Sequence, residues 1–505
     1  MGASCERVSI RYLTVTCLTY SVDNPRYWVA IRVLLLIYTR PAICVVFYLK
    51  ANCMYFEKPS RFVLVCALLC GLATAAHAET TGEEQASAHV QFTYNWQYHP
   101  AYGAAYSGPN SLMAASEKMY TLSMTGFFGF RPWQGGEVYF NPEVAQGVPF
   151  STSLVGLGGF TNGEITRAGG TNPVPYRQRL FLRQTWNQGG ESERVEPGVN
   201  NQLAGWVDKN RFVLTLGNFS TLDVFDPNRY AKDARTQFMN WGNWTYAAYD
   251  YAADARGFGW GFAGEWYKDE WGLRFGRMTG PRRPNELPVD WAIGKHYGDQ
   301  IEVEHEHSLG GHPGKMRVLG WRSRAVTASF ADALAWLNAH PNPGGRTYAG
   351  PDALFAVRNT EKIKYGLGVN FEQEVNQNAG FFLRAMQADG RTETYAFTEV
   401  DGSLSTGMLV KGNAWGREND GAGISLARNT LSADRRSFLA AGGTSYFIGD
   451  GKLSYRPEVI FEGYYSFGFT KNTWLTADYQ RIQNPAYNAD RGPMHVYALR
   501  LHAEL

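Results

Sequence analysis

The chain has 505 residues, and its cysteines and charges are unevenly distributed. All six cysteines lie before residue 79, so the remainder has no disulfide framework and no thiolate metal site. Of the 48 Lys/Arg and 46 Asp/Glu, residues 1–78 hold 8 and 3, which leaves 40 and 43 in the remainder and no basic excess that would indicate nucleic-acid binding.

Residues 54–78 have the pattern of a secretory signal peptide. Lys58 and Arg61 form its basic region, residues 62–73 its apolar region, and Ala76 to Ala78 a small-x-small cleavage site. We therefore expect export with cleavage after Ala78, which makes residues 79–505 the mature protein.

Residues 1–53 precede a signal that is complete without them. We expect translation to start at Met54, so that residues 1–53 are an upstream extension from a misplaced start codon. The alternative is an inner-membrane segment over residues 28–48, an apolar stretch interrupted by Arg32 and Arg40.

The mature chain is built of alternating apolar and polar residues, which indicates β-strands. Residues 90–98 and 362–374 show the alternation most clearly, and no stretch after residue 79 approaches the roughly 18 apolar residues of a membrane helix. Further strands are predicted near residues 119–130, 137–140, 211–218, 258–266, 271–275, 301–307, 317–324, 381–388, 395–400, 404–412, 421–428, 458–469, 473–480 and 495–505. Residues 142–175 and 219–256 are predicted as long loops, and residues 328–339 and 433–441 as short helices within loops.

The strand predicted at residues 176–186 is the most informative about function. Successive side chains of a strand point to opposite faces, so its arginines and leucines are expected on different sides. The expected polar face holds Arg177, Arg179, Phe181 and Arg183. The expected opposite face holds Gln178, Leu180, Leu182, Gln184 and Trp186. In a membrane barrel the leucines would meet lipid and the arginines would line a water-filled lumen.

The last predicted strand, residues 495–505, ends the chain on an alternating pattern, which suits a barrel that closes its last strand on its first. Barrels prefer an even number of strands, and the strands named here give an estimate of about 16. The predicted fold is therefore all-β: a transmembrane antiparallel barrel of about 16 strands, with long extracellular loops, some of them folded into the lumen.

Several stretches in this order resemble the OprB-type carbohydrate-selective porin family, from about Gln97 to the C-terminus. The stretches are residues 137–143 (EVYFNPE), 156–164 (GLGGFTNGE), 176–186, 249–257 (YDYAADARG), 296–304 (HYGDQIEVE), 478–480 (DYQ), 484–493 (NPAYNADRGP) and 499–504 (LRLHAE). One departure is the final Leu505, where such barrels usually carry an aromatic residue that the insertion machinery reads. The resemblance implies a 16-stranded outer-membrane channel that passes sugars such as glucose by facilitated diffusion.

A pore that favours a neutral, hydroxyl-rich solute needs fixed donors and acceptors that replace its hydration shell. Arginine offers five donors in a rigid fork, carboxylates accept from hydroxyls, and aromatic faces can stack on a sugar ring. The candidate pore-lining and substrate-binding residues are Arg179, Arg183, Phe181, Asp223, Asp226, Tyr230, Glu302, Glu304 and Arg322. For any one of them the competing interpretation is an ion-pair lattice that stiffens the wall.

The same residues are compatible with other functions. A general porin, or one selective for anions or aromatic acids, would also suit lumenal arginines. A barrel enzyme is less favoured because no Gly-x-Ser-x-Gly nucleophile motif is present. His305, His307 and His312 could in principle bind a metal, but the first two share a face with Ile301 and Val303, so no metal and no cofactor is expected. The expected partners are sugars, outer-membrane lipid and lipopolysaccharide, and the barrel insertion machinery, for a monomer or homotrimer that binds no nucleic acid.

Overall fold

The computed structural model describes residues 14–18, 30–34, 82–168, 170–198, 201–340 and 352–505. The chain forms two compact units, Met1–Cys70 and Gly71–Leu505. In the first unit, β1 (Thr14–Leu18) pairs antiparallel with β2 (Ala30–Leu34). The predicted signal peptide, residues 54–78, and most of the predicted upstream extension lie outside the described residues.

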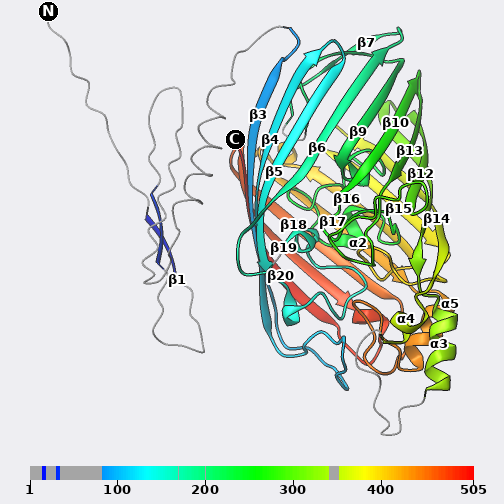
Figure 1. The fold of residues 1–505 in the computed structure, drawn as a ribbon. Coiled ribbons are helices and arrows are strands. Elements are labelled where there is room, and N and C mark those ends of the chain that lie inside the picture. The colour runs from blue at the N-terminus through cyan, green and yellow to red at the C-terminus, as the bar shows by residue number, and fades with distance from the viewer. Residues whose placement is uncertain (1–13, 19–29, 35–81, 169, 199–200, 341–351) are drawn as a thin grey trace, which may run out of the picture. The chain divides into compact units, whose positions relative to one another are not determined.

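The second unit contains a closed antiparallel barrel of 16 strands, as the alternation of apolar and polar residues predicted (Figure 1). Each strand pairs with the next in the chain, except that β6 pairs with β9, and the last strand pairs with β3 to close the ring. The sixteen strands are β3 (Ala86–His99), β4 (Glu117–Trp133), β5 (Gly136–Val148), β6 (Val174–Asn187), β9 (Arg211–Phe219), β10 (Gly259–Lys268), β11 (Trp271–Met278), β12 (Tyr297–Leu309), β13 (His312–Thr327), β14 (Thr360–Asn376), β15 (Ala379–Ala388), β16 (Gly402–Lys411), β17 (Gly421–Thr430), β18 (Glu458–Thr470), β19 (Thr473–Gln483) and β20 (Met494–Glu504). The strands β7 (Ser192–Val195) and β8 (Gly205–Asp208) form a separate hairpin between β6 and β9.

The strand β14 shows how the alternation places side chains. Ile363, Tyr365 and Leu367 are exposed, whereas Lys364 and Asn370 are buried. Because neighbouring side chains of a strand point to opposite faces, the apolar row faces outward and the polar row faces the interior of the barrel.

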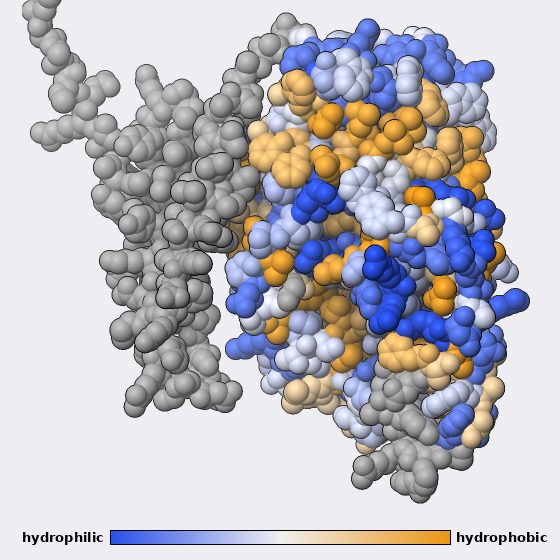
Figure 2. All heavy atoms as spheres, viewed as in Figure 1, coloured by the Kyte–Doolittle hydropathy of each residue, from blue (hydrophilic) through white to orange (hydrophobic). Residues whose placement is uncertain are grey.

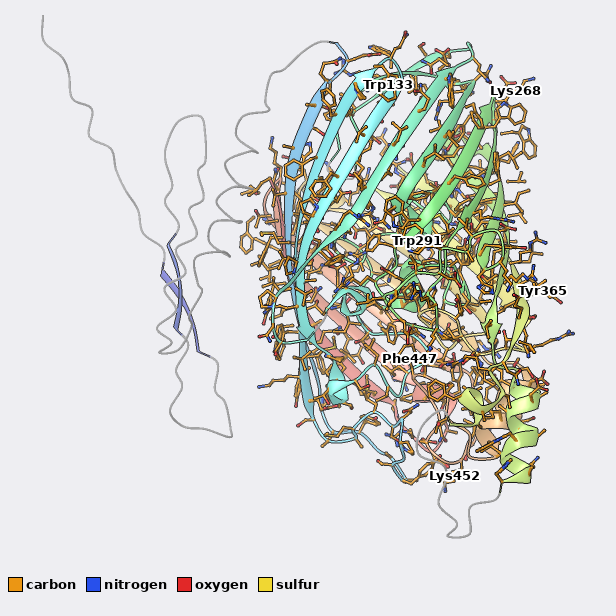
Figure 3. The ribbon with its side chains drawn as sticks, viewed as in Figure 1. Trp133, Lys268, Trp291, Tyr365, Phe447 and Lys452 are labelled. Atoms are coloured by element: carbon orange, nitrogen blue, oxygen red, sulfur yellow. The ribbon has the colours of Figure 1, made fainter. Side chains whose placement is uncertain are left out.

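The two ends of the barrel differ in the length of their connections. Trp133 and Lys268 lie near short turns at one end, and Phe447 and Lys452 lie in long loops at the opposite end (Figure 3). The loop-bearing end is the extracellular end of a barrel of this kind. Its loops span residues 100–116, 149–173, 220–258, 279–296, 328–359, 389–401, 431–457 and 484–493.

Two sequence predictions about these loops are wrong, and two are confirmed. Residues 395–400 are not a strand; they belong to the loop before β16, where Tyr395 and Ala396 bond through their backbone N–H groups to the buried carboxylate of Asp250. The loop predicted at residues 142–175 is shorter, because β5 continues to Val148 and β6 begins at Val174. The predicted helices are present as α3 (Phe330–Ala339) and α5 (Ala433–Ala440), and the short helices α2 (Trp241–Trp244) and α4 (Asp352–Val357) add to them.

The loop between β9 and β10, residues 220–258, is packed inside the barrel. Met239 and Asn240 donate their backbone N–H groups to the carboxylate of Glu462 on β18. On the adjoining wall, the guanidinium of Arg500 on β20 donates to the backbone carbonyls of Ala234 and Gln237. Many of the loop's apolar side chains belong to the main buried cluster, so the core of this barrel consists largely of an inserted loop.

The outer face of the barrel is apolar between two zones of aromatic residues. Trp133, Trp186, Trp266 and Trp271 are exposed near the short-turn end, and Tyr365 and Tyr497 are exposed nearer the loop end. Figure 2 shows apolar surface gathered in a belt beneath the polar rim of short turns. Aromatic zones on either side of an apolar belt are typical of membrane interfaces. None of the described helices is long and apolar enough to cross a membrane.

Candidate pore-lining site

The arginine strand, β6, carries a bulge that corrects its predicted faces. Asn141 on β5 pairs with Arg179, but the next residue, Pro142, pairs with Arg177, so Gln178 is an extra residue. A bulge of this kind reverses which side chains face inward on either side of it. Arg177 therefore lies on the outer face, where its guanidinium stacks on the ring of Trp260 at 5.0 Å. Gln178 instead faces the lumen and donates to Glu143 at 2.5 Å.

Beyond the bulge, Arg179 faces the inserted loop. Its Nε and Nη2 atoms donate to Oδ2 and Oδ1 of Asp223 at 2.7 and 2.6 Å. The guanidinium also stacks over the ring of Phe258, 5.1 Å from the centroid. The pair is not sealed from solvent, because the two side chains keep 13% and 24% of their surface exposed. Donors, acceptors and an aromatic face thus meet on a solvent-accessible part of the lumen.

Asp223 stays charged at this position. Burial would raise its pKa, but the charge of Arg179 and the hydrogen bonds from Arg179 and from the backbone N–H of Ser220 hold that pKa below its usual value. The loop forms a single 3-10 turn here, in which Ser220 and Asp223 cap one another. The short turn therefore fixes the carboxylate in front of Arg179.

Arg183 forms a second charged pair, toward the short-turn end. It lies 3.8 Å from a carboxylate oxygen of Glu137 on β5 and donates to the backbone carbonyl of Asn201 at 3.0 Å. Its guanidinium lies 5.3 Å from the ring centroid of Tyr139 and 5.4 Å from that of Phe181. Its side chain is 26% exposed, whereas Phe181 itself is buried beneath it. Arg179 and Arg183 thus form one lumenal row, with a carboxylate beside each.

Asp226, also a predicted site residue, anchors the inserted loop and is fully buried. Its Oδ1 accepts from Arg384 on β15 at 2.7 Å and from Asn370 on β14 at 2.6 Å. Its backbone N–H donates to the carboxylate of Glu302 on β12 at 3.0 Å. Asp226 has a φ of 55°, in the left-handed region that aspartate tolerates better than most residues. It therefore fastens the loop to three strands of the opposite wall.

Glu302 and Glu304 face the interior but are buried in an ion-pair lattice. Arg274 on β11 donates to both carboxylates, at 2.8 and 3.0 Å. Arg317 on β13 donates to Glu304 at 2.5 Å and approaches Glu372 within 3.3 Å. A lattice of this kind stiffens the wall, and its members have almost no surface with which to meet a solute.

Two further predicted residues lie apart from the Arg179–Asp223 pair. Tyr230, in the inserted loop, is buried against Gly380 of β15. Arg322 does not face the lumen, because Arg317 and Trp321 occupy the buried side of β13 and the alternation turns Arg322 outward. There it is 54% exposed and paired with Asp299 at 3.0 Å.

Sequence reasoning missed a buried charged cluster that ties two loops to the wall. Arg235 of the inserted loop donates to Glu143 of β5 at 2.7 Å and to Glu164 at 2.9 Å. Glu164 lies in the loop between β5 and β6 and also accepts from Arg167 at 2.6 Å and Ser123 at 2.7 Å. Burial raises the pKa of Glu164, but the two arginines and the hydrogen bonds together lower it to about 2. No periodic pattern marks Glu164, Arg167 and Arg235, because they lie in loops.

The three histidines considered as metal ligands have other contacts. His305 packs against Trp271, His307 bonds to Gln373 and stacks on Phe371, and His312 lies 3.5 Å from Glu374. Over the part of the chain that the structure describes, no three His, Cys, Asp or Glu side chains form a group that could hold a metal ion.

Comparisons with known proteins match this architecture. Residues 130–505 match the family model described as carbohydrate-selective porin, OprB family. The high-pH structure of Pseudomonas putida OprB superposes with a TM-score of 0.59 at 15% identity, covering 83% of this chain and 94% of that one. The outer-membrane channel DcaP of Acinetobacter baumannii gives a TM-score of 0.46 at 9% identity, covering 85% and 100%. At such identities the likeness to solved structures concerns the fold alone. No curated protein sequence matches the chain.

Proposed function

The chain belongs to the OprB family of carbohydrate-selective porins, and from this premise we propose that it carries glucose and similar monosaccharides across the outer membrane by facilitated diffusion. The family and the closed barrel make the protein an outer-membrane channel and point away from an enzyme. The identity of the solute and the pore-lining residues are our proposal.

The observation that carries the proposal is the row of paired charges on β6. The partly exposed guanidinium of Arg179 faces the carboxylate of Asp223, and that of Arg183 lies near Glu137, each arginine beside an aromatic ring. A sugar hydroxyl can accept from an arginine and donate to a carboxylate, so it can exchange water for these groups at little cost. Weak, repeated sites of this kind allow a solute both to enter and to leave.

The carboxylates beside Arg179 and Arg183 also favour a sugar channel over an anion channel. Arginines without carboxylates would produce a positive field along the path and favour anionic solutes. Here each lumenal arginine of β6, Arg179 and Arg183, has a carboxylate within 4 Å, so the net charge of the row is close to zero. This balance supports a neutral solute over an anion.

A titration of single-channel current with glucose tests the proposal. Glucose held at Arg179 and Asp223 excludes ions, so millimolar glucose should reduce the current through wild-type channels in a saturable manner. Sucrose is larger than glucose and should therefore reduce the current less, whichever side of the membrane it is added to. A current unaffected by glucose, in channels that conduct ions normally, would contradict the proposal.

The export route is proposed on the sequence alone. We propose that residues 54–78 are removed after Ala78, that residues 1–53 are an upstream extension and that the barrel insertion machinery then assembles residues 79–505 as a monomer or homotrimer. Mass spectrometry of the protein from outer membranes should give Glu79 as the first residue.

A further inference from the structure

A groove of about 390 Å³ lies on the outer face of the barrel, away from the lumen, at the extracellular ends of β17, β18 and β19. The lining residues are Arg428, Arg456, Pro457, Val459, Gln483, Asn484 and Ala489. Arg428 is exposed between the buried Ala427 and Asn429, so strand alternation directs it outward. Val459 pairs in register with both Arg428 and Gln483, which places these side chains in one outward-facing row.

The groove is basic and lacks a counter-charge. Arg428, Arg456 and the nearby exposed Arg481 make no ion pair with any carboxylate among the described residues. Arg481 belongs to the adjacent row, where it pairs in register with Phe461 and His495. Two arginines thus line the groove, and a third lies in the adjacent row of the same outer face, on a surface whose own acids do not neutralise them.

The opposite situation holds on the outer face of β11 to β14. There Arg322 and Arg277 share the carboxylate of Asp299, at 3.0 and 2.7 Å. Arg324 is paired with Glu361. Those outward arginines are satisfied within the wall, whereas the arginines of the groove are available to an external anion.

Apolar surface begins directly below the groove, toward the membrane centre. Leu426 pairs with Phe461, and both are exposed on the outward face. Leu426 lies two residues from Arg428 and Phe461 two residues from Val459, and Arg481 pairs with Phe461 in the same row. Ile424 continues the apolar surface along β17. A ligand of this site would therefore have an anionic head at the level of the arginines and acyl chains below it.

We propose that the groove binds the phosphorylated glucosamine head group of lipopolysaccharide in the outer leaflet. Arg428 and Arg456 donate charge-assisted hydrogen bonds to one phosphate, in the forked geometry that guanidinium groups offer to phosphate oxygens. Arg481 stands beside them toward the apolar surface, and the acyl chains lie along Leu426 and Phe461. The exposed amide of Gln483 is placed to meet the sugar hydroxyls. This site does not depend on which solute passes through the lumen.

The test measures binding of purified bisphosphorylated lipid A to the full protein in detergent by native mass spectrometry. The variant Arg428→Gln/Arg456→Gln should bind about tenfold more weakly than the wild type, as expected for the loss of charged contacts to phosphate. The control Arg322→Gln/Arg324→Gln removes the same charge from ion-paired positions on the outer face and should bind within about twofold of the wild type. Lipid A without its two phosphates should bind equally weakly to the wild type and to the variant Arg428→Gln/Arg456→Gln.

Three results would overturn the proposal. The first is equal binding of lipid A by the groove variant and the wild type. The second is equal binding of the phosphorylated and dephosphorylated lipids by the wild type. The third is binding of pyrophosphate as tight as that of lipid A, since it would identify a soluble anion as the ligand. Should the double variant fail to fold, Arg481→Gln replaces it in the same comparisons.

Discussion

Arg179 and Asp223 join the wall of the barrel to its inserted loop through two parallel hydrogen bonds, from Nε to Oδ2 at 2.7 Å and from Nη2 to Oδ1 at 2.6 Å. This is the bidentate geometry in which a guanidinium and a carboxylate interact most strongly. Both side chains nevertheless remain partly exposed, so the pair can meet a solute without separating. Its partial exposure to the lumen distinguishes this pair from the buried ion pairs around Glu302.

Neutralising this pair should weaken sugar transport without closing the channel. In Arg179→Gln/Asp223→Asn the lumen keeps its net charge, but the hydrogen bonds to the sugar no longer involve charged groups. We expect the glucose influx into proteoliposomes at low glucose to fall about 3- to 10-fold. The matched change Arg194→Gln/Glu196→Gln removes an exposed pair on the β7–β8 hairpin and should leave influx unchanged.

The single changes should alter ion selectivity in opposite directions. Arg179→Gln leaves Asp223 unpaired and should favour cations, and Asp223→Asn leaves Arg179 unpaired and should favour anions. Reversal potentials in a salt gradient measure the selectivity directly. Shifts of the same sign in both variants would show that the pair does not face the ion path.

Removing the loop anchor should release the inserted loop. Arg384→Ala leaves the carboxylate of Asp226 buried without its cation, a change that costs about 3–5 kcal/mol when a buried pair is broken. We expect trypsin to cut at Lys232 and Arg235 at least about tenfold faster than in the wild type, because local opening exposes both sites.

Replacing both anchor residues by neutral ones shows whether the loop is released by the unpaired charge or by the loss of packing. In Arg384→Met/Asp226→Asn no charge is left unpaired, and asparagine also tolerates the left-handed backbone at position 226. Its digestion rate should therefore lie closer to that of the wild type than the rate of Arg384→Ala does. Equal digestion of Arg384→Ala and the wild type would argue against the anchor.

Gly380 on β15 allows Tyr230 of the inserted loop to approach the wall. A Cβ atom at this position would lie 1.9 Å from Cζ of Tyr230, so Gly380→Ala must displace a buried ring. Such overpacking costs about 1–3 kcal/mol and should lower the thermal unfolding midpoint. Gly463→Ala on β18 is the control, because its nearest contact would be an ordinary 3.6 Å. Equal midpoints for the two variants would contradict the packing.

The bracing of two loops by Glu164 should depend on pH. Its folded-state pKa of about 2 lies below its ordinary value of 4.5, so the stability it contributes is present above pH 4.5 and is lost as the pH falls toward 2. Glu164→Gln lacks this contribution at every pH. The difference in thermal midpoint between the wild type and Glu164→Gln should therefore be large at pH 7 and shrink progressively below pH 4.5.

Strand alternation predicted the barrel because a wall between lipid and a polar interior imposes a strict period of two. It predicted the strand of Arg179 and Arg183, and it placed Asp223 and Asp226 in a long loop. It misplaced Arg177 because one extra residue in β6, opposite Pro142, reverses the faces, and alternation alone does not reveal a bulge.

The remaining errors concern loops that fold inside the barrel. Residues 395–400 resemble a strand because the aromatic Tyr395 and Phe397 lie two residues apart, yet both rings are buried in an irregular loop. The contacts of Arg235 with Glu143 and Glu164 join residues far apart in the chain, and no local pattern encodes them. Arg384 and Arg500, by contrast, alternate with outward apolar residues, and that signal could have identified them as lumenal.

We propose that the lumen selects a neutral sugar over an anion of similar size. Swelling of proteoliposomes containing the purified mature protein, with glucose, gluconate and sucrose as solutes, tests this claim directly. We predict that glucose enters faster than gluconate, that sucrose enters more slowly than either, and that the preference for glucose over gluconate disappears in Asp223→Asn. Entry of gluconate at the rate of glucose or faster in the wild type would contradict this selectivity.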